Sequence, residues 1–254
     1  MSELVRISFE NQEEDLKDRV EGYWSKRADS FFTLKAEEAE SQHKIRWGKE
    51  LKRLLPTGEC LKILDVGCGA GFFEAVLGEL GYQVIGIDLT EEMVGKAEEM
   101  IRLHQLDSER VRVMSMDAEK LAFADETFDA VVTRNLTWTL PHPQKAYREW
   151  HRVLKKGGVL LNFDAEYAKH AHENLYSEKN KAHQELSLDM KDECHQIYHM
   201  LTISTLERPV WDREVLQGIG FEQVETEVDF GDRIFLSEDK FYIPDRLFSI
   251  RAVK

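Results

Sequence analysis

Short apolar runs that alternate with segments of helical spacing constrain the fold of this chain more than any other feature. Five such runs, rich in Val, Ile, Leu and Phe, lie at residues 61–66, 82–87, 110–114, 128–133 and 158–163. Segments with apolar residues three and four positions apart follow three of them, at 72–81, 90–105 and 142–158. Strands that alternate with helices are joined by right-handed crossovers into a parallel sheet. The pattern therefore predicts an α/β fold with a doubly wound, mostly parallel sheet.

The alternation is interrupted once and then resumes. Residues 165–209 are polar, have helical character and hold five of the nine histidines. A helical pattern at 211–220 and strand patterns at 221–230 and 246–254 follow, so the sheet is expected to have seven strands. Ligands of such sheets bind beyond the carboxyl ends of the strands, so an insertion after the fifth strand lies over the binding edge. We expect it to be a helical lid.

A single domain over residues 1–254 is the expected organisation. With 254 residues, of which 42% are hydrophobic, the chain can bury one substantial core. The expected parts are a helical N-terminal cap at 1–55, a cofactor-binding core at 60–164, a lid at 165–210 and the C-terminal part of the sheet at 211–254.

Charge and composition exclude several functional classes. No run approaches the roughly 18 apolar residues of a membrane span, and the charged start does not resemble a signal peptide. The three cysteines form no CxxC pair, which suits free thiols in a reducing compartment. The net charge of −14 repels phosphate backbones. We expect a cytoplasmic protein that binds neither nucleic acid nor membranes.

A glycine-rich loop follows the first predicted strand. The stretch reads ILDVGCGAGFF at residues 63–73, with Asp65 before glycines at Gly67, Gly69 and Gly71. The dinucleotide fingerprint GxGxxG would need a third glycine at position 72, which is Phe72. The spacing therefore opposes an NAD(P)-dependent oxidoreductase, which we keep as a second alternative.

This loop resembles the first motif of the class I S-adenosylmethionine-dependent methyltransferases, and the chain is most similar to the small-molecule, ubiquinone/menaquinone methyltransferase-like members. The resemblance covers residues 60–164 and resumes loosely from Trp211. It implies a Rossmann-like methyltransferase fold, S-adenosyl-L-methionine as methyl donor and S-adenosyl-L-homocysteine as product. Glycines allow the backbone to approach this cofactor closely, and the N–H groups of the next helix suit its carboxylate. Asp65 is then free to serve the cationic side of the site.

A second match lies at the end of the second predicted strand. Asp88 follows Gly67 by 21 positions, where an acidic side chain can accept hydrogen bonds from both ribose hydroxyls. The next helix has a better N-cap in Thr90, which leaves Asp88 for the ligand. Leu89 and Met93, beside these residues, are assigned to the same cofactor site.

Two further matches follow the third and fourth predicted strands. The resemblance places Asp117, Ala118 and Glu119 at the adenine, and Asn135 and Leu136 beside the sulfonium. The loop at 135–137 lacks the Asn/Asp-Pro-Pro-aromatic tetrad of enzymes that methylate DNA bases or protein glutamine. In the same stretch, the glycine pair at 157–158 is expected to end the helix and lead into the fifth strand.

The cap and the lid supply the remaining candidates. Tyr23, Trp24 and Arg27 resemble an N-terminal helix that folds over cofactor and substrate, and we assign Trp24 and Arg27 to the cofactor. The alternative is that these aromatic side chains only pack the helix on the core. His195 and His199, at i and i+4, could supply two metal ligands, but no third ligand is visible and we expect no metal. The catalytic residues stay unassigned; if a base is needed, His195, His199 and Tyr23 are the candidates.

The predicted function is direct transfer of a methyl group to a small-molecule acceptor. Such a displacement needs alignment and exclusion of water rather than a dedicated nucleophile. The first alternative is an S-adenosylmethionine-binding protein with another activity or none, because fold alone does not determine function. The expected partners are the small-molecule acceptor and, in a homodimer, a second copy of the chain.

Overall fold

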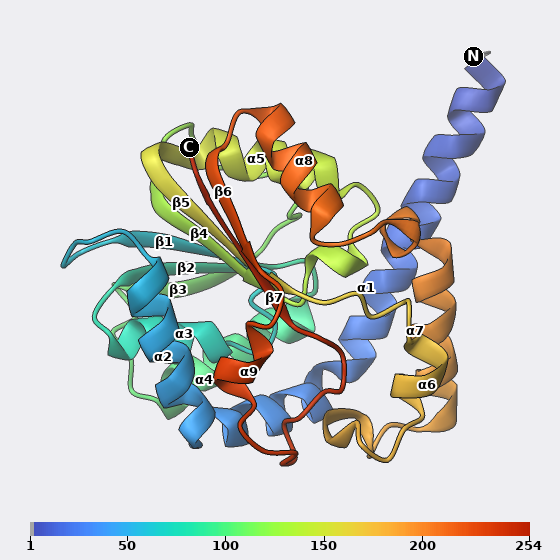
Figure 1. Cartoon of the computed structure of the whole chain (residues 1–254), viewed down its shortest axis with the longest axis horizontal. Coiled ribbons are helices and arrows are strands. Elements are labelled where there is room, and N and C mark those ends of the chain that lie inside the picture. Colours follow the sequence, from blue (N-terminus) through green and yellow to red (C-terminus); the bar gives the residue numbers. More distant parts are fainter. Residues whose placement is uncertain (1–2) are drawn as a thin grey trace.

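Within residues 3–254, which the computed structural model describes, seven strands form one twisted sheet at the centre of the molecule (Figure 1). The strand order is β3-β2-β1-β4-β5-β7-β6. Strands β1 to β5 run parallel, and β7 lies antiparallel between β5 and β6. Their bounds are β1 (Lys62–Val66), β2 (Gln83–Asp88), β3 (Val111–Ser115), β4 (Phe128–Arg134), β5 (Leu154–Asp164), β6 (Glu222–Glu227) and β7 (Phe248–Val253). The prediction of a doubly wound, mostly parallel seven-stranded sheet is confirmed.

Helices cover both faces of the sheet because its central strands are apolar on both sides. In β4, Ala130 and Val132 face one core cluster, whereas Val131 faces the other. The first face is covered by α2 (Gln42–Leu54), α3 (Phe72–Glu79), α4 (Glu91–Leu103) and the short α9 (Gly231–Ile234) (Figure 1). The opposite face is covered by α5 (Pro143–Val153) and α8 (Val210–Ile219).

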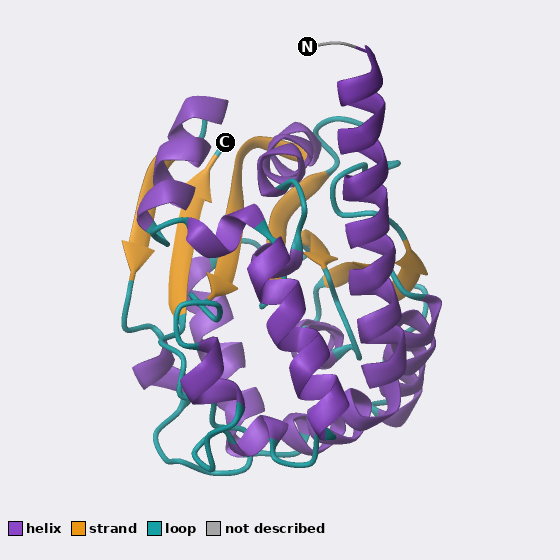
Figure 2. Cartoon of the chain, turned by 90° about the vertical axis from the view of Figure 1, so that its right-hand side faces the viewer, coloured by secondary structure: helices purple, strands orange, loops and turns teal. Residues whose placement is uncertain are grey.

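The remaining helices stand beyond the carboxyl ends of the strands, in front of the sheet in Figure 2. They are α1 (Glu3–Ala39), α6 (Ala171–Leu175) and α7 (Leu188–Met200), with three short helical turns η1 (Thr137–Thr139), η2 (Lys181–His183) and η3 (Thr202–Thr205). Aromatic side chains join them: the Trp138 ring lies 4.7 Å from that of Tyr198 in α7 and 6.3 Å from that of Trp24 in α1, measured between centroids. A separate apolar cluster thus covers the ligand edge.

The end of α5 differs from the prediction. The helix ends at Val153, and β5 begins at Leu154, so Gly157 and Gly158 lie inside the strand and do not cap the helix. Leu154 is fully buried and pairs with Phe128 of β4, which draws the chain into the sheet before the glycines are reached. The ladder register shifts between Phe128 and Ala130, and Gly157 has a φ of +74° there. The two glycines allow the backbone to adopt this irregular conformation.

None of the described helices combines the length and the apolar character that crossing a membrane requires.

Candidate functional site

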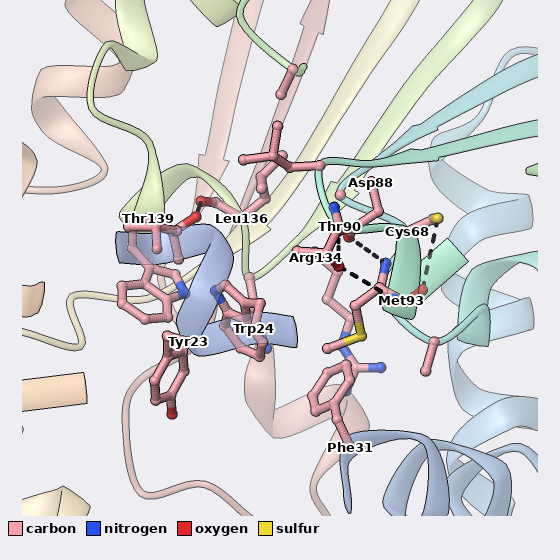
Figure 3. A pocket seen from close by; sticks show the side chains of 18 of the residues that line it. Tyr23, Trp24, Phe31, Cys68, Asp88, Thr90, Met93, Arg134, Leu136 and Thr139 are labelled. Atoms are coloured by element: carbon pink, nitrogen blue, oxygen red, sulfur yellow. Dashed lines mark hydrogen bonds between the residues drawn. The ribbon is translucent and has the colours of Figure 1, made fainter. Parts of the chain in front are cut away.

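A large pocket lies where the loops after the first four strands meet α1 and the lid (Figure 3). The sheet contributes the glycine loop after β1 and the segments that follow β2, β3 and β4. Helix α1 lines the opposite wall, and the lid adds residues from η2 and α7. Eleven of the predicted cofactor residues and one predicted base, Tyr23, line this pocket. The cofactor residues are Trp24, Asp65, Gly67, Gly69, Asp88, Leu89, Met93, Asp117, Ala118, Asn135 and Leu136.

The glycine loop is held against β2 by its backbone. The N–H groups of Gly67 and Cys68 donate to the carbonyl of Ile87 at 2.8 and 2.9 Å. Gly71 lies outside the pocket lining; it begins α3 with a φ of +86°, and a Cβ there would lie 2.9 Å from the Cα of Ala97. Its role in this structure is the close packing of α3 on α4.

Gly69 faces α1, the helix of the N-terminal cap. Its φ is +52°, and a Cβ on it would lie 3.1 Å from the ring of Phe31 in α1. Phe31 also contacts Trp24, with ring centroids 5.5 Å apart. Phe31 of the cap and Gly69 of the loop therefore line the same part of the pocket (Figure 3).

The carboxylate of Asp88 connects the glycine loop to the start of α4. One oxygen accepts from the Gly69 N–H at 3.0 Å, and the other accepts from the Thr90 N–H at 3.0 Å. Thr90 is the N-cap of α4, as predicted, and its hydroxyl accepts from the Met93 N–H. Burial raises the pKa of Asp88, and these hydrogen bonds oppose that rise. Asp88 is thus free of the capping role but holds the loop in place.

Asp65 is paired with a second buried acid that the sequence did not reveal. Asp65 and Glu74 of α3 are both almost completely buried, and neither carboxylate oxygen of Glu74 has a hydrogen-bond partner among the described residues. Burial raises the pKa of Asp65 to about 8 and raises that of Glu74 as well. Gly86 of β2 makes room for Glu74, since a Cβ there would overlap a carboxylate oxygen of Glu74. Because both pKa values are raised, the pair presents less negative charge at neutral pH than two ionised carboxylates would.

This pair should make stability depend on pH. The pKa of Asp65 is higher in the folded chain than its usual 3.8, so the folded state binds more protons between those two values and its stability falls as pH rises. For one proton the slope is at most about 1.4 kcal/mol per pH unit. Denaturant unfolding at several pH values should show a steeper fall in the wild type than in Asp65→Asn, and Glu74→Gln should flatten the profile similarly. Parallel profiles for all three proteins would contradict the raised pKa values of this pair.

The predicted adenine loop is fixed to the cap by a lysine. Lys17 of α1 donates to Asp117 at 2.8 Å and to Glu119 at 2.9 Å. Glu119 itself lies outside the pocket lining, and its other oxygen accepts from the His142 N–H at 2.7 Å. Sequence reasoning missed Lys17, because nothing in the local pattern links α1 to this loop.

The cap residues Tyr23, Trp24 and Arg27 occupy different places. Tyr23 and Trp24 line the pocket, and burial raises the pKa of the Tyr23 phenol. Arg27 is 3% exposed and lies beside the Phe31 ring, behind the lining.

The two lid histidines that were predicted as candidates do not line the pocket. His195 and His199 lie on the outer part of α7 with their Nε2 atoms 3.2 Å apart. The described residues include no cluster of three or more His, Cys, Asp or Glu side chains that could hold a metal ion. The lid instead lines the pocket with Ala182, His183, Cys194 and Tyr198. Cys194 and Tyr198 are also at i and i+4. The helix was therefore predicted, but the face that lines the pocket is the one that carries Cys194 and Tyr198, next to the predicted face.

Comparisons with known proteins agree with this arrangement. The family described as "Methyltransferase domain" matches residues 64–162. A demethylmenaquinone methyltransferase of Bacillus cereus is 30% identical over 148 residues, which cover 57% of this chain and 61% of that protein. The chain spans about half to three fifths of the length of the first curated relatives that it matches.

Solved structures share the fold at lower identity. Phosphoethanolamine N-methyltransferase 2 of Haemonchus contortus, in complex with S-adenosyl-L-methionine, is 22% identical with a TM-score of 0.59, covering 82% of this chain and 52% of that one. The [4+2]-cyclase SpnF is 21% identical with a TM-score of 0.54, covering 82% and 80%. The fold is therefore shared by proteins whose names describe different reactions.

Proposed function

We propose, from the premise that the chain belongs to the class I S-adenosylmethionine-dependent methyltransferases, that it transfers the methyl group of this cofactor to a small-molecule acceptor. S-adenosylmethionine is the cofactor of this family. One observation supports the proposal above all: the glycine loop, Asp88 and the Asp117 loop line the same pocket as the aromatic side chains of Trp24 and Trp138. One half of the pocket suits the cofactor, and the other half is enclosed by cap and lid.

The residues have distinct roles in the proposed reaction. The glycine loop would hold the methionyl part, Asp88 the ribose hydroxyls, and Asp117 with Ala118 the adenine. Asn135 and Leu136, after β4, would lie beside the sulfonium. The cofactor supplies the reactive methyl group, so the protein has to align the acceptor and exclude water.

Cap and lid would complete the acceptor half. Tyr23, Trp138 and Tyr198 come from α1, η1 and α7, and each lines the pocket and is buried. We keep the division into cap, core, lid and C-terminal part as a proposal. A cytoplasmic location is supported by the three free thiols of Cys60, Cys68 and Cys194, and a homodimer stays a prediction.

The likeness to a cyclase favours one alternative, a protein that binds the cofactor for another reaction or for none. Calorimetric titration with S-adenosylhomocysteine and with NADH tests the cofactor first. We expect S-adenosylhomocysteine to bind and NADH not to bind. Acceptor-dependent release of S-adenosylhomocysteine from S-adenosylmethionine then tests transfer. Cofactor binding without turnover across broad acceptor panels would favour the alternative. Binding of NADH without binding of S-adenosylhomocysteine would contradict the proposed function.

Turnover should separate Tyr23 from His195. With an accepted substrate, Tyr23→Phe is expected to lower the rate by roughly fivefold, the value of one hydrogen bond of about 1 kcal/mol, because Tyr23 is a buried residue of the pocket lining. His195→Ala, outside the lining, should have little effect. Binding of S-adenosylhomocysteine is the control for both variants. A larger loss of rate in His195→Ala than in Tyr23→Phe would instead favour His195 as the catalytic residue.

A further inference from the structure

Three cationic side chains meet at the end of the pocket where α1 approaches β4. Lys35 of α1 and Arg134 at the end of β4 line the pocket, with 12% and 10% of their side chains exposed. A single carboxylate, that of Glu38, pairs with both: it accepts from Lys35 at 2.6 Å and from Arg134 at 2.8 Å. Arg27, about two helical turns before Lys35 in α1, is the third cation and lies behind the pocket lining. Its guanidinium and the Lys35 ammonium both lie over the Phe31 ring.

This end of the pocket has more positive charge than its carboxylates balance, and more hydrogen-bond donors than it has acceptors. Among the described residues, Nε and Nη1 of Arg134 and Nε of Arg27 are buried without a hydrogen-bond partner. Buried donors are normally paired, because an unpaired one costs about 1–3 kcal/mol. Burial and the neighbouring arginines lower the pKa of Lys35 to about 8. Asp65, another acid close to Arg134, is buried with its pKa raised to about 8, so it adds little negative charge at neutral pH.

A lid histidine adds one more donor. His183 lines the pocket, and its Nδ1 lies 3.3 Å from the side-chain nitrogen of Asn180. An amide nitrogen can only donate, so Nδ1 accepts and the proton of the neutral ring is on Nε2. Burial, together with Arg27 and Lys35, lowers the pKa of His183 to about 3, so the ring is neutral at physiological pH. It therefore offers an N–H group without needing a carboxylate partner of its own.

We propose that Lys35, Arg134 and His183, with Arg27 adding positive charge behind them, form a binding site for an anionic oxygen group, a carboxylate or a phosphate, on the methyl acceptor. This inference rests on the proposed function. Guanidinium groups bind such anions through paired N–H donors, which are the groups left unpaired here. The cationic sulfonium and ammonium of the cofactor would be repelled at this end.

Two observations favour the acceptor over the carboxylate of the cofactor itself. Three cations against Glu38 leave more positive charge than one cofactor carboxylate would balance. His183 comes from the lid, which lies outside the matched residues 64–162 and encloses the acceptor half. The acceptor class is therefore an anion with an apolar body that can pack on Trp138 and Tyr198, rather than a neutral quinone.

Binding of simple anions to the protein saturated with S-adenosylhomocysteine tests the site. The probes are inorganic phosphate and benzoate, measured by calorimetry on the full chain. Arg134→Lys keeps the charge but loses the paired donors, and Lys35→Gln removes a charge; each should weaken binding of the better probe by about tenfold, as for loss of a charged hydrogen bond. Lys52→Gln, an exposed lysine of α2, is the matched control and should bind as the wild type does.

Three results would overturn the proposal, and they are distinguishable. If S-adenosylhomocysteine binds normally but neither probe binds, or both probes bind the variants unchanged, the anion site is absent while the proposed function stands. A second result is that the probes compete with S-adenosylhomocysteine. If the variants also weaken binding of S-adenosylhomocysteine but not binding of 5′-methylthioadenosine, which lacks the amino acid part, the cluster holds the cofactor carboxylate. If S-adenosylhomocysteine itself does not bind the wild type, the proposed function fails and this inference fails with it.

Discussion

Replacing Asp88 by alanine is expected to weaken binding of S-adenosylhomocysteine by about ten- to a hundredfold. Two ribose hydroxyls would lose a charged acceptor, and such hydrogen bonds contribute about 1.5–3 kcal/mol. The same carboxylate accepts from the N–H groups of Gly69 and Thr90 in the protein without ligand. Its removal therefore also frees the loop that the methionyl part of the cofactor would contact.

Calorimetry on Asp88→Ala, Asp88→Asn and Asp232→Ala separates these contributions. Asp88→Asn keeps one oxygen for the loop but loses the charge, so it should fall between the wild type and the alanine variant. Asp232 is exposed in α9, and its replacement should leave affinity unchanged. A natively folded Asp88→Ala protein with wild-type affinity would remove this residue from the binding site.

The parallel core was predictable because its signals are local. Each strand is a short apolar run bounded by a turn, and the cap of α4 at Thr90 depends on residues three positions apart. The placement of Asp88 and Asp117 follows from the same fact, since residues that end neighbouring parallel strands meet at one edge. The end of α5 was mispredicted because the pairing of Leu154 with Phe128 is a long-range contact.

The parts of the pocket that come from the cap, the end of β4 and the lid could not be predicted in the same way. Lys17, Arg134 and His183 reach the pocket from a cap, a strand end and a lid that are far apart in sequence, and no periodicity links them. The helix that holds His195 was expected, but which of its faces is buried depends on the packing of Cys194 and Tyr198 against α1 and Trp138. Tertiary contacts, not local spacing, decide that choice.

Replacing Arg208 by alanine is expected to lower the free energy of unfolding by about 3–5 kcal/mol, the usual cost of removing one partner from a buried ion pair. Arg208 is 5% exposed, between η3 and α8. It donates to Asp164 at the end of β5 at 2.9 Å and to Asp212 of α8 at 2.9 Å, so its loss leaves two buried carboxylates without their cation. Arg213→Ala, an exposed arginine of the same helix, is the control and should change stability little.

The pH dependence of that loss identifies its cause. Without Arg208, burial would raise the pKa of Asp164 further above its usual value, and the folded variant would take up protons that the unfolded chain binds more weakly. The variant should therefore lose less stability relative to the wild type near pH 5 than near pH 8 in denaturant titrations. A deficit that does not change with pH would point to lost packing on the Phe248 ring instead, over which the guanidinium lies at 5.0 Å.

The same variant tests how the buried network serves the pocket. Asp164 accepts from the Trp138 N–H at 3.0 Å, so the carboxylate that pairs with Arg208 also fixes the loop after β4. Trp138 lies in the proposed acceptor half, whereas Asp88 at the end of β2 and Met93 in α4 lie in the proposed cofactor half. If the network positions the acceptor loop, Arg208→Ala at a temperature where it is folded should weaken turnover more than binding of S-adenosylhomocysteine. Equal losses in both would mean that Arg208 stabilises the whole sheet edge and not this loop in particular.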